Sequence, residues 1–216
     1  IEISDVVFSS DADSFFQPSD PNGSNGGEMA LIRNSQDITI TGNHVSGYLH
    51  GLQVFESTDI TVQGNEITEI IGDGIRLAGV QNVDVSGNHL HDFFATTNEY
   101  THSDFIQLWS TNAQIESRDV TISGNLLDAG NGNSAQGIWM RNELNDTGAD
   151  RSYVYENLVI TDNVIYTGSP NGIGIGVADG VTVSNNTLLW NPEATTLING
   201  REYSWPPSIR IDDRVQ

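Results

Sequence analysis

The sequence lacks two residue types altogether. Its 216 residues include no cysteine and no lysine, so all eight basic residues are arginine. Without cysteine there is no disulfide framework, no CxxC redox site and no cysteine nucleophile. Apolar runs are also short, and none approaches the roughly 18 residues of a membrane-spanning helix.

Positive charge is scarce. Twenty-nine acidic residues against eight arginines give a formal net charge of −21 and a pI of about 4.1. Phosphate backbones and anionic lipids need clustered cations, so we expect neither a nucleic acid nor a membrane as a partner. An acidic, lysine-free and cysteine-free composition is typical of secreted bacterial or saline-environment proteins, and we expect an extracellular location.

What the sequence does contain is an internal repeat. One phrase, such as ITGNHV or VSGNHL, occurs six times, and its asparagines are Asn43, Asn65, Asn88, Asn125, Asn163 and Asn186. A second phrase, apolar-x-apolar, alternates with it at 30–32, 52–54, 75–77, 106–108, 138–140, 173–175 and 209–211. Asparagines at 43, 65 and 88 set a repeat of 22 to 23 residues. Both phrases alternate with a period of two and end in Gly, Asn or Asp, which predicts short strands ended by turns.

Neither phrase can bury its apolar side alone, whereas stacked coils bury a continuous column. The sequence therefore predicts an all-β fold, a right-handed parallel β-helix of about six to seven coils forming one domain over 1–216. An asparagine at one place in every coil can bond its neighbours above and below, which predicts an Asn ladder. Departures from the repeat predict inserted loops at 9–28, 91–103, 141–158 and 190–207. Because neither end carries a polar cap, we expect further domains of the same, longer chain.

These repeated phrases resemble the right-handed β-helix superfamily of carbohydrate-active proteins, which includes pectate and alginate lyases, mannuronan C5-epimerases and phage tailspikes. The resemblance covers nearly all of the chain. It implies a polysaccharide as the ligand. Leucine-rich repeats share the repeat length and the asparagine, but their LxxLxL spacing is absent.

Long loops on both sides of 106–110 and 138–142 predict a groove over these two strands. Alternation assigns the outward positions Asp104, Gln107, Trp109, Trp139 and Arg141, and on neighbouring coils Arg76 and Arg210. Sugar rings stack on aromatic faces, and guanidinium groups bind carboxylates through bidentate hydrogen bonds. We therefore expect Arg76, Gln107, Trp109, Trp139 and Arg210 to bind substrate. Alternatively, the loops at 110–118 and 141–158 cover both tryptophans.

The segment that enters the first groove strand carries acid–base groups. Cleaving a glycosidic bond beside a uronate by β-elimination, or inverting the uronate at C5, needs three groups. A cation neutralises the carboxylate, a base takes the C5 proton, and an acid protonates the leaving oxygen or returns the proton to C5. Tyr100, His102 and Asp104 alternate along this segment, and Arg141 lies one coil on. They resemble the Tyr, the Asp-Pro-His cluster and the Arg of mannuronan C5-epimerases, which implies that Tyr100, His102, Asp104 and Arg141 are catalytic. In structural roles, Asp104 would form a turn, Tyr100 would anchor its loop, and Arg141 would pair with Glu143 or Asp146.

The leading hypothesis is therefore a lyase or C5-epimerase acting on an acidic, alginate- or pectin-like polysaccharide. The alternatives are a non-catalytic glycan-binding or structural module of a tail fibre, tailspike or adhesin, and a tailspike-type hydrolase that uses acidic pairs. No cofactor is required, although Ca²⁺ is a candidate ligand of 9–28, which otherwise forms an Ω-loop. His44, Glu66 and His89 share one column, either as a metal site or as solvated charges.

Overall fold

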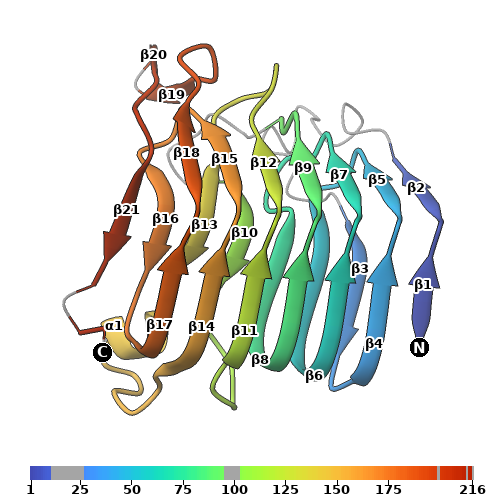
Figure 1. The fold of residues 1–216 in the computed structure, drawn as a ribbon, viewed down its shortest axis with the longest axis vertical. Helices are drawn as coiled ribbons and strands as arrows, with labels where there is room; N and C mark the ends of the chain where they lie inside the picture. The colour runs from blue at the N-terminus through green and yellow to red at the C-terminus, as the bar shows by residue number, and fades with distance from the viewer. Residues whose placement is uncertain (11–26, 95–102, 199, 213, 216) are drawn as a thin grey trace.

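The computed structural model describes residues 1–10, 27–94, 103–198, 200–212 and 214–215. Over these residues the chain winds into a stack of coils, with the first and last coils at opposite ends (Figure 1). In the part of the chain that the structure describes, every strand pair between coils is parallel, and the single antiparallel pair is a small hairpin between β19 (Thr196–Ile198) and β20 (Arg201–Tyr203). Among the described residues, no helix is long and apolar enough to cross a membrane.

Each coil contributes to three sheet faces, which we call A, B and C. Face A consists of β3 (Glu28–Arg33), the first halves of β6 (His50–Gln63) and β8 (Ile75–Ser86), β10 (Asp104–Leu108), β13 (Gln136–Met140), β16 (Asn171–Ile175) and β21 (Ser208–Ile211). Face B consists of β1 (Glu2–Ser4), β4 (Gln36–Thr41), the second halves of β6 and β8, β11 (Arg118–Ser123), β14 (Tyr155–Thr161) and β17 (Ala178–Ser184). Face C consists of β2 (Val7–Ser9), β5 (His44–Ser46), β7 (Glu66–Thr68), β9 (His89–His91), β12 (Leu126–Asp128), β15 (Val164–Thr167) and β18 (Thr187–Trp190).

The predicted β-helix is confirmed, and the seven strands of face C agree with the predicted six to seven coils. The sequence phrase around the asparagine proves to be two strands on different faces rather than one. A left-handed residue precedes each ladder asparagine, as at Gly64 (φ 63°) and Asp162 (φ 57°), and turns the chain from face B to face C. Glycine adopts this φ without strain, which explains why it fills the position in four coils.

The predicted Asn ladder is also confirmed. Each buried asparagine donates its side-chain amide to the next asparagine's Oδ1 and to a main-chain carbonyl. For Asn88 these bonds run to Asn125 Oδ1 (3.0 Å) and to Val62 O (2.9 Å). Its own Oδ1 accepts from the main-chain and side-chain nitrogens of Asn65. The ladder thereby satisfies polar groups at the sharp corner of every coil.

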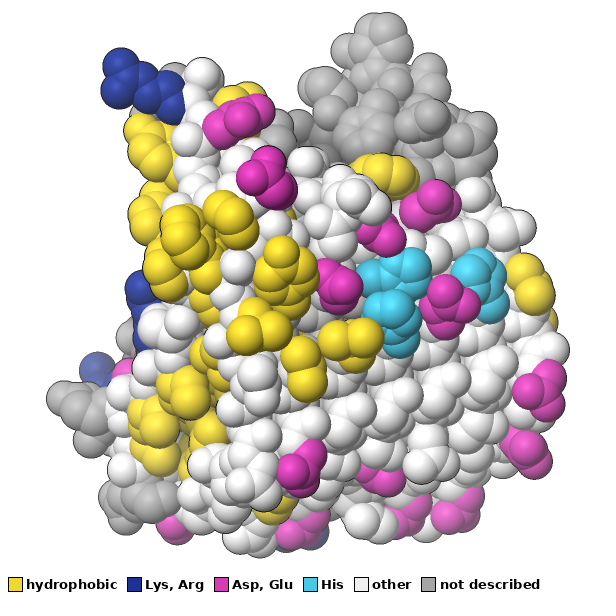
Figure 2. Space-filling view, turned by 45° about the horizontal axis from the view of Figure 1, so that its top comes forward, with side chains coloured by type: hydrophobic (Ala, Val, Ile, Leu, Met, Phe, Trp, Pro, Cys, Tyr) yellow, Lys and Arg dark blue, Asp and Glu magenta, His cyan; other side chains and the backbone are white. Residues whose placement is uncertain are grey.

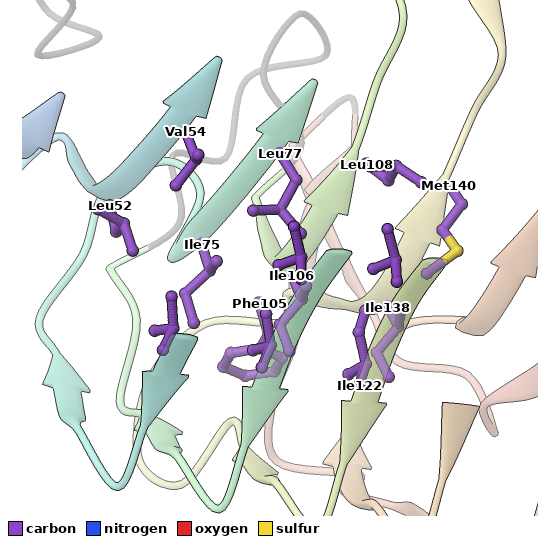
Figure 3. Packing of buried hydrophobic residues seen from close by; sticks show 14 of the residues in the cluster. Leu52, Val54, Ile75, Leu77, Phe105, Ile106, Leu108, Ile122, Ile138 and Met140 are labelled. Atoms are coloured by element: carbon purple, nitrogen blue, oxygen red, sulfur yellow. The ribbon is translucent and has the colours of Figure 1, made fainter. Parts of the chain in front are cut away.

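Apolar side chains of equivalent positions stack inside the coils. Face A contributes two such columns, Leu52–Ile75–Ile106–Ile138 and Val54–Leu77–Leu108–Met140, all almost fully buried (Figure 3). Burying each such side chain stabilises the fold by about 1.5–3 kcal/mol, so the columns fix the register between coils. Residues that alternate with them face outward and form the surface of face A.

Two predicted loops contain regular structure. The segment 141–158 holds the short helix α1 (Glu143–Asp146), and its last residues already belong to β14. The segment 190–207 holds the β19–β20 hairpin. The other two insertions, 9–28 and 91–103, lie largely outside the described residues. The sequence could not predict α1, because a single helical turn leaves no periodic pattern.

Candidate functional site

The outer surface of face A gathers the scarce positive charge. Strand register places Gln53, Arg76, Gln107, Trp139, Gly174 and Arg210 in one row across the sheet. Arg33 lies at the end of β3, and Arg141 follows β13 directly. Four of the eight arginines therefore belong to this one face of a strongly acidic protein.

An aromatic platform lies beside this row. Phe55 and Trp109 have ring centroids 6.3 Å apart, although the strand carrying Ala78 runs between them. The small Ala78 is fully buried and leaves room for the two rings to approach. Arg33 lies over the Phe55 ring at 5.1 Å, and Arg76 lies over the Trp109 ring at 4.7 Å. Cations thus flank a half-buried aromatic surface on both sides.

Two buried carboxyl groups lie beneath Arg76. Asp73 Oδ1 accepts a hydrogen bond of 2.9 Å from the main-chain N–H of Asp104. Burial raises the pKa of Asp73 to about 6, against the opposing charge of Arg76. Burial, and then the neighbouring Asp73, raise the pKa of Asp104 well above its usual range. Burial therefore favours the protonated form of both carboxyl groups, and Asp73 titrates slightly below neutrality.

The two acids position polar side chains at the surface. Asp73 Oδ2 lies 3.2 Å from Arg76 Nε, and Asp104 Oδ2 accepts a 2.9 Å hydrogen bond from Gln107 Nε2. Arg76 also donates to Gln53 Oε1 at 3.2 Å. The other Asp104 oxygen, Oδ1, is buried and has no hydrogen-bond partner among the described residues. An oxygen without a partner is costly to bury, which marks this position as a candidate site.

His50 completes the group. Its Nδ1 accepts a 2.9 Å hydrogen bond from the main-chain N–H of Asp73 and lies 3.8 Å from Asp73 Oδ2. Burial, followed by the charge of Arg76, lowers the pKa of His50 to about 4. The imidazole is therefore neutral at neutral pH.

A hollow of about 270 Å³ opens on face A toward the C-terminal coils, and it is lined by the predicted residues Trp139, Arg141 and Arg210. Asp146 of α1 also lines it and holds Arg141, with Oδ2 3.3 Å from Arg141 Nε. This is one of the two partners predicted for Arg141 in a structural role. The hollow lies over β13, β16 and β21 rather than over β10 and β13, one coil further than predicted.

The Trp139 indole packs directly on Gly174. A side-chain carbon at Gly174 would collide with the six-membered ring of the Trp139 indole, so the ring lies over this residue. We expect Gly174→Ala to lower the free energy of unfolding by about 1–3 kcal/mol by displacing the indole. Chemical denaturation of Gly174→Ala, Trp139→Ala and the double variant checks this. In the double variant the indole is absent, so Gly174→Ala should cost much less stability there than in the wild-type background. Strictly additive effects of the two substitutions would contradict the contact between Trp139 and Gly174.

The predicted site residues do not form a single cluster. Arg76, Gln107 and Trp109 lie together above the acid pair, and Trp139, Arg141 and Arg210 share the hollow. Tyr100 and His102 lie outside the described residues and stay predictions. The expectation that Asp104 faces the groove is wrong, since its side chain is fully buried. Phe105 and Ile106 are both fully buried as well, so strict alternation fails at the start of β10.

Sequence reasoning missed His50 and Asp73 as members of the site. The available signal was that both occupy the column of Asp104, two residues before an inward apolar side chain. A polar residue there is also compatible with a plain turn, so the column alone could not distinguish the two roles. Both tryptophans are half-buried, between the exposed and the covered alternatives.

Comparison with known proteins supports the fold. Residues 28–204 match the family model of the right handed beta helix region. The chain belongs to this family. No curated protein matches the chain. Among solved structures, this β-helix is similar to DFA-IIIase from Arthrobacter chlorophenolicus A6 in complex with GF2, with a TM-score of 0.50 and 11% identity over 87% of the chain.

The β-helix spans about half of that DFA-IIIase chain, 51% of its length. An alginate lyase from Paenibacillus sp. str. FPU-7 is also similar, with a TM-score of 0.37 and 10% identity over 99% of this chain and 80% of the lyase. At these identities the likeness concerns the fold, and function has to be argued from the site.

Proposed function

We propose that this β-helix is secreted, that its face A binds an acidic, uronate-containing polysaccharide, and that it acts on this polysaccharide by lyase or C5-epimerase chemistry. The observation that supports this most is the gathering of arginines and aromatic rings above a buried acid pair. Aromatic rings suit the apolar faces of sugars, and guanidinium groups suit their carboxylates. A polysaccharide lying across the coils would contact both clusters in turn.

The chemistry requires one proton to leave C5. A cation first neutralises the uronate carboxylate, which makes the C5 proton acidic, and a base then removes it. In elimination an acid protonates the departing glycosidic oxygen, and in epimerisation an acid returns a proton to the opposite face of C5. Arg76, Arg141 and Arg210 are the proposed cations. Tyr100 and His102 remain the proposed proton-transfer groups, and Asp73, with its pKa of about 6, is a further one.

The net charge of −21 does not prevent such binding. At physiological ionic strength the Debye length is about 8 Å, so distant carboxylates are largely screened from a chain on face A. The local arginines therefore decide the interaction. Ca²⁺ bridging acidic groups of protein and polysaccharide would reduce the repulsion further, and we propose it as an optional ligand.

A hydrolase is the second candidate. Glycoside hydrolases use two carboxyl groups in different environments, one protonated and one ionised. Asp104 and Asp73 form a neighbouring pair of carboxyl groups, and burial raises the pKa of both.

Product analysis tests the proposal. The protein is incubated with alginate, polygalacturonate and neutral glycans, with and without Ca²⁺. Ultraviolet absorbance of unsaturated uronate reports elimination, NMR reports C5 inversion, and new reducing ends without unsaturation report hydrolysis. Hydrolysis alone would replace the proposed chemistry by the second candidate. Retention of the glycan without any product would leave a binding module and overturn the enzymatic proposal.

Arg76→Gln is expected to reduce activity on the acidic polysaccharide by about 10- to 100-fold, because removing one partner of a charge-assisted contact costs about 1.5–3 kcal/mol. Initial rates at several substrate concentrations measure the effect. Arg118→Gln is the matched control, since Arg118 is an exposed arginine on face B with an acidic neighbour of its own. Equal losses in both variants would indicate a general charge effect and contradict the assigned face.

A further inference from the structure

Histidines gather on face C, which is separate from the proposed polysaccharide site. Strand register places His44, Glu66 and His89 in one row across β5, β7 and β9, as the sequence column predicts. His91, two residues after His89, lies on the same side and stacks on the His89 ring with centroids 4.2 Å apart. Figure 2 shows histidine side chains gathered on one face of the molecule among several acidic side chains.

Glu66 lies at the centre of this group. Its Oε1 is 3.1 Å from His91 Nε2, and its Oε2 is 2.8 Å from His44 Nδ1. One ligand atom from each of Glu66, His89 and His91 can be chosen so that all three lie within 4.8 Å of one another. Around a tetrahedral metal ion with bonds of about 2.0–2.1 Å, ligand atoms are about 3.3 Å apart. A small side-chain rotation therefore brings the three atoms around one ion.

We propose that Glu66, His89 and His91 bind a divalent transition-metal ion, with Zn²⁺ as the best match. Two imidazoles and one carboxylate are a ligand set that suits Zn²⁺, and three protein ligands leave a fourth position open. Ca²⁺ and Mg²⁺ prefer oxygen ligands, so this site should discriminate against both.

Two details of the histidines support the assignment. His89 Nε2 is buried and has no hydrogen-bond partner among the described residues, and a metal ion would satisfy it. His91 Nδ1 lies 2.7 Å from Asp92 Oδ2. If Nδ1 donates to this carboxylate, the lone pair of Nε2 points toward Glu66, as in carboxylate–histidine–metal arrangements.

His44 plays a different part in the proposed site. It contacts the Glu66 oxygen that does not face His91, so it orients the carboxylate without being a ligand. A hollow of about 430 Å³ beside the group is lined by His44, Glu66, His91 and Asp92, which gives an ion access from solvent. This inference is independent of the proposed function of face A.

Isothermal titration of untagged, chelator-treated protein with ZnCl₂ tests the site, and CoCl₂ provides a spectroscopic signature of the ligand set. We expect one Zn²⁺ per chain, unaffected by a large excess of Ca²⁺ or Mg²⁺. His89→Gln and His91→Gln should each weaken Zn²⁺ binding at least tenfold, and Asp92→Asn by about 10-fold or more. His44→Gln should change it less than threefold, since glutamine can still donate to Glu66.

Circular dichroism of every variant confirms that the β-helix is retained, so that a loss of binding can be assigned to the site. Absence of Zn²⁺ binding by the folded wild type overturns the proposal. Binding that survives His89→Gln but is lost in His44→Gln overturns the ligand set. Saturation by Ca²⁺ in place of Zn²⁺ overturns the assigned metal class.

Discussion

Replacing Asn88 by Ala is expected to lower the free energy of unfolding by about 4 kcal/mol. The Asn88 side chain makes four hydrogen bonds, to Asn65, Asn125 and Val62. Each contributes about 1 kcal/mol, and the partners left behind are buried where water cannot replace the lost bond. Because neighbouring coils of a solenoid support one another, a gap in the middle of the ladder also weakens the interface on both sides.

The end of the ladder supplies the control. Asn186 bonds to Asn163 and Ile160, is only partly buried, and is the last ladder asparagine among the residues that the structure describes. Asn186→Ala should therefore cost clearly less than Asn88→Ala, about 1–2 kcal/mol. Thermal and denaturant unfolding measure both variants. Equal losses at the two positions would mean that the ladder does not act as a connected stack.

Asp104→Asn is expected to make the protein more stable and less active. Burial disfavours the ionised form of the Asp104 carboxyl group, and this destabilises the folded protein at pH 7. A neutral amide of the same shape should therefore raise the free energy of unfolding by on the order of 2 kcal/mol. If the acid pair serves catalysis, activity should fall in the same variant by about 10-fold or more, since removing a proton-transfer group or its partner costs rate. A gain in stability with a loss of activity is the expected signature of a functional site.

The pH dependence has a defined sign. The folded-state pKa values of Asp73 and Asp104 are raised above the unfolded value of 3.8. Their contribution to stability is therefore fully present below about pH 4 and is lost as pH rises through the folded pKa, which for Asp73 is about 6. Asp104→Asn removes its share of this fall, so the gain from the substitution should be larger at pH 7 than at pH 4.

His50 acts in the opposite direction and serves as the control. Its folded pKa is lowered from 6.5 to about 4, so stability is lost as pH falls from about 6.5 toward 4. His50→Gln, whose side-chain oxygen can accept the bond from Asp73, should therefore gain stability at acid pH relative to the wild type. Denaturant unfolding at several pH values measures the gain in stability of each variant over the wild type. This gain should rise with pH for Asp104→Asn and fall with pH for His50→Gln. Changes of the same sign in both variants would contradict the assigned directions of the pKa shifts.

The repeat in the sequence is sufficient to predict the β-helix. A repeat is local and periodic, so equivalent residues must stack, and this placed the Asn ladder, the apolar columns and the outward row with Arg76, Trp139 and Arg210. The same argument predicted the His44–Glu66–His89 row on face C. These features need only the register between neighbouring coils, which the apolar columns fix.

The side-chain contacts beside the interruptions of the repeat could be read only from the tertiary structure. Burial of Asp104 and its contact with Asp73 depend on side-chain directions at the start of β10, where two buried residues in succession interrupt alternation. The placement of the Trp139 ring over Gly174, its partner in the neighbouring strand, depends on the side-chain direction of Trp139. The position of the hollow depends on α1, whose Asp146 reaches Arg141 from outside the repeat. Such contacts carry no periodic signal, because they join segments of unequal length whose packing is fixed only when the coils are stacked.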